Sequence, residues 1–172
     1  MKAVEELKAE HEKIKLMLQI LGKVYQKLEK KEKVDFSDLN KIYEFLKNFA
    51  DKCHHGKEED LLFRELEKAG MPSKKGPIKI MNLEHNLGRK YVKGFKEGIE
   101  EKKEQKIIEN AKKYIELLTQ HIEKEDNILY PMAEKILPEN KDKELMEGFE
   151  KIETERIGKE GHQNLLNILE AL

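Results

Sequence analysis

The chain has 172 residues, which is enough for one domain with a core of its own. Charged residues make up 40% of it, but 34 Lys and Arg are balanced by 35 Asp and Glu. This balance disfavours a nucleic-acid footprint and a polybasic membrane anchor. No apolar run is long enough to span a bilayer, no signal peptide is visible, and a single cysteine, Cys53, suits a reducing compartment. We therefore expect a cytoplasmic protein whose partner is neither a nucleic acid nor a membrane.

Apolar residues recur at spacings of three and four along almost the whole chain, which predicts helices and no strands. The first helix is predicted over about 2–31. After a polar break, Asp35 or Ser37 can cap a second helix. That helix should end at Gly70 and Pro72, because glycine adopts the left-handed conformation after a helix and proline cannot continue one.

The third helix is predicted to start near 73–77, the fourth to end by Pro138, and a fifth to cover about 142–171. Four long helices with short links favour an up-down-up-down bundle. We therefore predict an all-α fold in a single domain, 1–172, with the bundle over about 1–138 and an accessory C-terminal helix packed on it.

Four of the six histidines lie on the apolar faces of four different helices. A single inward histidine is usually a hydrogen-bonded core residue. Four of them need partners that apolar faces do not offer, and a metal would satisfy them all. These four are His11, His85, His121 and His162.

An internal repeat adds carboxylates to this set. Residues 54–63, HHGKEEDLLF, align without a gap on residues 121–130, HIEKEDNILY. The histidine and the glutamate four positions later lie one turn apart on the same helix face, so both can reach one metal cluster. A carboxylate has two oxygens that can bridge two metals, and imidazole with carboxylate suits iron.

These residues resemble the hemerythrin-like (HHE cation-binding) domain family. The strongest parts of the resemblance are residues 53–63, 84–89 and 121–134, and it covers nearly the whole chain. The resemblance implies a four-helix bundle with two non-haem iron ions bridged by carboxylates. The ligands that it implies are His11, His54, Glu58, His85, His121 and Glu125.

The sequence departs from the hemerythrin pattern at two places. Arg89 stands where hemerythrins carry a second histidine on the third helix, so a fifth imidazole must come from elsewhere or be missing. We expect His162 to supply it, although His162 could equally be a hydrogen-bonded core residue. His55 is the other candidate, but a regular helix turns it about 100° away from the ligand His54. On the fourth helix Asp126 is also spaced to be a ligand, but the repeat favours Glu125.

The functional expectation is a di-iron protein that binds dioxygen or a related small ligand, such as nitric oxide or peroxide. A binding protein is favoured over an enzyme. The resemblance also allows repair of iron centres or iron donation, and a regulatory module that responds to iron or oxygen.

Overall fold

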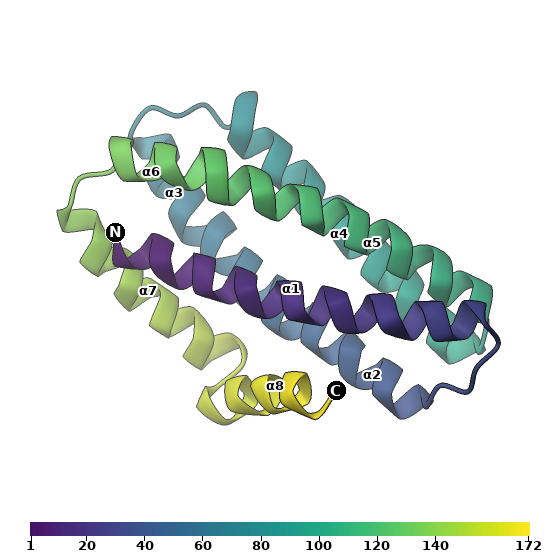
Figure 1. Cartoon of the computed structure of the whole chain (residues 1–172). Helices are drawn as coiled ribbons and strands as arrows, with labels where there is room; N and C mark the ends of the chain where they lie inside the picture. Colours follow the sequence, from purple (N-terminus) through teal and green to yellow (C-terminus); the bar gives the residue numbers. More distant parts are fainter.

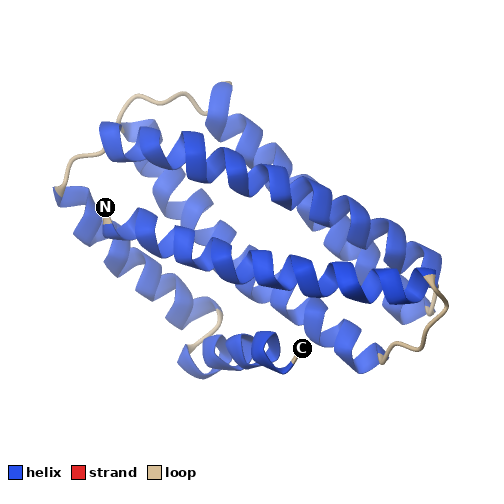
Figure 2. Ribbon diagram, viewed as in Figure 1, coloured by secondary structure: helices blue, strands red, loops and turns tan.

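The computed structural model describes all 172 residues and is helical throughout, which confirms the all-α prediction (Figure 2). Three short segments, labelled η, are π-helical and continue the α-helices on either side of them. None of the helices has the length and apolar character needed to cross a bilayer. The elements are α1 (Lys2–Glu29), α2 (Phe36–Glu44), η1 (Phe45–His55), η2 (Glu58–Leu62), α3 (Phe63–Lys68), α4 (Gly76–Glu101), α5 (Glu104–Lys124), η3 (Glu125–Leu129), α6 (Tyr130–Ile136), α7 (Asn140–Arg156) and α8 (Lys159–Ala171).

Local signals set the ends of these helices. Asp35 caps α2, since its carboxylate accepts the backbone N–H of Ser37 at 2.8 Å. Gly70, which follows α3, has a φ of +105°, a conformation that glycine adopts without strain. Pro77 occupies the first turn of α4, where its missing N–H leaves no hydrogen bond unmade.

Four long rods lie alongside one another: α1, the run from α2 to α3, α4, and the run from α5 to α6 (Figure 1). Their apolar faces form two separate core clusters, one around Phe45 and Phe95 and the other around Phe63 and Tyr130. A layer of buried polar side chains lies among the same helices. Its members are Glu10, His11, His54, His55, Lys57, Glu58, His85, His121 and Glu125.

The C-terminal segment differs from its prediction. The pattern predicts one helix over about 142–171, whereas the structure has two, α7 and α8. They are separated at Gly158, whose φ of +80° ends the helical path. The two helices pack on different parts of the core, with Phe149 of α7 in one apolar cluster and Leu165 of α8 in the other.

Candidate metal centre

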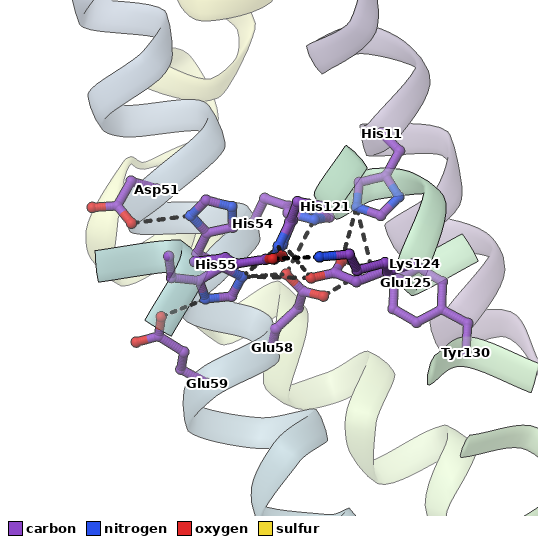
Figure 3. A network of polar contacts seen from close by, with 12 residues as sticks. His11, Asp51, His54, His55, Glu58, Glu59, His121, Lys124, Glu125 and Tyr130 are labelled. Carbon is purple, nitrogen blue, oxygen red and sulfur yellow. Dashed lines mark hydrogen bonds and ion pairs between the residues drawn. The ribbon is translucent and has the colours of Figure 1, made fainter. Parts of the chain in front are cut away.

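Six of the seven side chains predicted as metal ligands meet among the four rods (Figure 3). Each is at most 1% exposed. These six are His11, His54, Glu58, His85, His121 and Glu125. Because charged and polar groups are buried only when something satisfies them, their convergence marks the candidate site.

The donor atoms form two groups, and within each group they lie within 4.8 Å of one another. Such spacing lets one cation contact every member of a group. Glu58 belongs to both. The groups are His55, Glu58, His85 and His121 on one side, and His11, His54, Glu58 and Glu125 on the other.

The two carboxylates lie between the groups. Oε1 of Glu58 is 3.3 Å from Nε2 of His54 and 3.5 Å from Nε2 of His85. Oε2 of Glu125 is 3.1 Å from Nε2 of His11, while its Oε1 is 3.5 Å from Nε2 of His85. Each carboxylate therefore borders imidazoles of both groups, as a bridge between two cations must.

Several atoms of this cluster have no hydrogen-bond partner. Buried polar atoms are normally paired, so such atoms call for a ligand. Of the five buried side-chain polar atoms that lack a partner, four belong to the two groups: Nε2 of His54, Nε2 of His55, Oε1 of Glu58 and Oε1 of Glu125. Imidazole nitrogen and carboxylate oxygen together are a donor set that iron accepts, so these residues fit iron.

His55 faces the cluster, although a regular α-helix would turn it about 100° away from His54. It ends the π-helical segment η1 and belongs to a different donor group from His54, so the two side chains face the cluster in different directions. The His55 side chain is 4% exposed, and its ring stacks on that of His85 with centroids 3.9 Å apart. The π-helical segments η2 and η3 begin at Glu58 and Glu125, so irregular helix accompanies both motifs.

His162 lies outside both groups and belongs instead to a separate, partly exposed group with Glu10 and Glu153. Its Nε2 is 3.5 Å from Glu153 of α7, its ring packs near Phe49, and its side chain is 23% exposed. The break at Gly158 starts α8 beside α7 and places His162 there. The ammonium of Lys57 separates His162 from the cluster, because this ammonium lies between the carboxylates of Glu153 and Glu10 and donates a hydrogen bond to each.

The structure also distinguishes the two adjacent acids of the fourth rod. Glu125 is fully buried and faces the imidazoles. Asp126 lies behind His11 and contacts its Nδ1 at 2.7 Å. Glu125 thus faces the cluster itself, whereas Asp126 stands behind one of its imidazoles.

Asp126 is one case of a general arrangement, in which each of the five clustered imidazoles has a carboxylate at Nδ1. This contact fixes the tautomer and leaves Nε2 to face the cluster, as in carboxylate–histidine–metal sites. The pairs, with their distances, are His11 and Asp126 at 2.7 Å, His54 and Glu10 at 3.0 Å, His55 and Asp51 at 3.2 Å, His85 and Glu59 at 2.6 Å, and His121 and Glu84 at 3.0 Å.

A cation stands behind each of these carboxylates. The Nζ of Lys57 is fully buried and lies 2.7 Å from Glu10, and that of Lys124 lies 2.6 Å from Glu84. Lys15 reaches Asp126 at 3.9 Å. Arg89 contacts the remaining two carboxylates, Asp51 and Glu59. Chain position gave little sign of most of these supports, because four of the five imidazole–carboxylate pairs join different helices; only Asp51 and His55 lie four residues apart on one segment.

The electrostatics of most of the cluster favour positive charge; His55 is the exception, because burial and the neighbouring imidazoles of His85 and His54 lower its pKa. Burial by itself would lower the pKa of His54, but Glu58 and Glu10 outweigh it and raise that pKa to about 10. The pKa of His121 is likewise raised to about 9, by Glu125 and Glu84 against the effect of burial. Carboxylates that hold protons on buried imidazoles would favour a metal cation in the same place.

The two halves of the site are related by a local two-fold repeat. The rings of His11 and His54 lie 4.6 Å apart, and those of His85 and His121 lie 4.7 Å apart. In both halves the residue before the first histidine is the glutamate that contacts the second. The repeat therefore extends from the donors to the residues that orient them.

Tyr130 is a polar member of the site that the ligand pattern missed. Its hydroxyl is 2.9 Å from Oε2 of Glu58 and 3.0 Å from Oε2 of Glu125, and its ring stacks on that of His11. The equivalent residue, Phe63, stacks on His85 but has no hydroxyl. The final, aromatic position of the ten-residue repeat was the available signal.

Comparison with known proteins agrees with this geometry. Residues 2–133 match the hemerythrin HHE cation binding domain, and the chain belongs to that family. Uncharacterized proteins of Mycobacterium bovis and Mycobacterium tuberculosis are each 22% identical to it over 171 residues, which is 96% of this chain. The chain spans 66% of the length of these relatives. No solved structure matches it significantly.

Proposed function

We propose that the protein is a non-haem di-iron protein that binds dioxygen or a related small ligand, such as nitric oxide or peroxide. The observation that carries the proposal is the pair of buried donor groups joined by Glu58, with four donor atoms that make no hydrogen bond within the protein. Membership of a cation-binding family supports it.

We assign three imidazoles to one metal position and two to the other, with Glu58 and Glu125 shared between them. His55, rather than His162, is the proposed fifth imidazole, because it is buried in the cluster and has a carboxylate at Nδ1. The position of His11 and His54 then has fewer protein donors, so it is the one that leaves room for a small ligand.

The surroundings of that second position suit a small ligand. When bound, two iron ions would supply a binding position and two electrons. The hydroxyl of Tyr130 lies 3.3 Å from Nε2 of His11 and donates to the carboxylates of Glu58 and Glu125, so it borders the place of such a ligand and holds the shared carboxylates there. The apolar cluster around Leu7 and Phe63 would exclude water from it.

We also propose that the four rods form the up-down-up-down bundle of a single hemerythrin-like domain, working in the cytoplasm. The run over about 1–138 would hold the centre. The segment over about 142–171 would support it, since Glu153 of α7 pairs with Lys57 beside the cluster.

Metal analysis combined with optical spectroscopy tests the proposal. We expect about two iron ions per chain, and a visible band when the anaerobically reduced protein meets air. A reversible band favours a carrier, whereas irreversible bleaching favours turnover. One ion per chain, or zinc alone without iron uptake, would overturn the di-iron assignment.

A further inference from the structure

Arg89 contacts two carboxylates that support neighbouring imidazoles. Its Nε is 2.9 Å and 3.1 Å from the two carboxylate oxygens of Asp51, and its Nη2 is 2.8 Å from Oε2 of Glu59. Asp51 in turn contacts Nδ1 of His55, and Glu59 contacts Nδ1 of His85. One guanidinium therefore stands behind two imidazoles, which are stacked on each other and belong to the same donor group.

The two-fold repeat makes Arg89 the counterpart of Lys15, since each lies four residues after the single histidine of its helix. Lys15 reaches only one carboxylate that supports an imidazole, Asp126, at 3.9 Å; its nearer partner is Glu12 at 3.0 Å, and its side chain is 43% exposed. Arg89 has two carboxylates that support imidazoles to hold, because Asp51 is added to Glu59. A planar guanidinium with five donors can hold two carboxylates at fixed angles, whereas an ammonium acts as a point charge.

We propose that Arg89 is a positioning residue for one of the two metal positions, holding His55 and His85 through Asp51 and Glu59. The proposal rests on the metal centre proposed above. Without Arg89, these two carboxylates would face each other with no cation between them and would turn toward solvent. Both imidazoles would then lose the contact that fixes their tautomer and orientation.

The surroundings of Arg89 allow a direct chemical test. It lines a cavity of about 530 Å³ between η1 and α4 that also reaches His55, and its side chain is 36% exposed. A small guanidinium compound added to an Arg89→Ala variant can therefore enter the space that the side chain has left.

The experiment compares Arg89→Ala and Arg89→Lys with the full-length wild type. Each metal-free protein is titrated anaerobically with Co²⁺, whose visible absorption reports the coordination of each position, and with Fe²⁺. We expect Arg89→Ala to lower the affinity of one position by about 10- to 100-fold and to leave the other unchanged. The affinity of that position in Arg89→Lys should lie between those of the wild type and of Arg89→Ala. Added methylguanidinium should restore the Co²⁺ spectrum of Arg89→Ala.

Two control variants separate positioning from general stability. Arg156→Ala removes another arginine of similar exposure, 37%, whose partner Asp60 contacts no imidazole of the cluster. It should keep both affinities, and metal-free Arg89→Ala should unfold no earlier than metal-free Arg156→Ala. Lys15→Ala should affect only the other position, and weakly.

The outcomes are distinct. If Arg89→Ala binds both ions as tightly as the wild type, or loses both equally without rescue, the positioning role is wrong while the metal centre stands. If the wild type itself does not bind two ions, the proposed centre falls and this inference falls with it.

Discussion

Removal of the metal ions should lower the stability of the protein substantially. Four fully buried donor atoms make no well-formed hydrogen bond within the chain, although Oε1 of Glu58 lies 3.3 Å from Nε2 of His54 and pairs with it when that imidazole is protonated. A buried polar group left unsatisfied costs about 1–3 kcal/mol, so the set represents about 4–12 kcal/mol. Protonation of imidazoles beside the carboxylates recovers part of this free energy, and we therefore expect a loss of stability near the lower end of that range. For a domain of this size, about 4 kcal/mol corresponds to a fall of about 10 °C in the unfolding midpoint.

Calorimetry of the loaded, chelator-stripped and reloaded protein measures this difference. The stripped sample must be shown by metal analysis to be free of metal, and reloading with Fe²⁺ should restore the original midpoint. Equal midpoints for loaded and stripped protein would refute the reasoning, because they would mean that the buried donors are satisfied without a metal.

Three further predictions concern single side chains. Glu58→Ala and Glu125→Ala should each release metal, whereas Asp126→Ala should only weaken metal binding, because Asp126 contacts His11 on the side away from the cluster. Metal analysis of the three variants tests this, and loss of metal from Asp126→Ala but not from Glu125→Ala would make Asp126 the ligand. His162→Phe should keep both ions and their spectrum, since the native side chain lies outside both donor groups, and loss of an ion would restore His162 as a ligand. The Cys53 thiol is fully buried, and burial raises its pKa to about 12, so it should react with a thiol reagent only after denaturation; rapid labelling of the native protein would contradict this.

Regular helical geometry was enough to predict most of the fold and most of the candidate donors. Spacings of three and four identified the helices, and the pairing of histidine with glutamate four residues later placed His54 with Glu58. The same assumption failed at His55. A step of about 100° per residue directed it away from His54, but there are two adjoining donor groups, and His55 faces the one to which His54 does not belong.

The supporting residues could not be predicted for a different reason. Glu10 and Asp51 are charged residues in a chain where 40% of residues are charged, and nothing local separates them from acids on the surface. Glu10 acts through a contact across helices, with His54, 44 residues away. Asp51 contacts His55 four residues later on the same segment, and its pairing with Arg89 of another helix is what distinguishes it from a surface acid. The position of His162 likewise depends on one backbone conformation, that of Gly158.

The local two-fold repeat has a consequence for how such a centre could originate. A two-helix peptide that carried one unit could pair with a second copy and supply four imidazoles and two carboxylates with identical surroundings. In a dimer of identical chains every substitution appears twice, so its two halves stay chemically the same. Joining two copies in one chain removes that constraint. His55, Arg89 and Tyr130 each occur in one half only, and they are differences that fusion of two units permits.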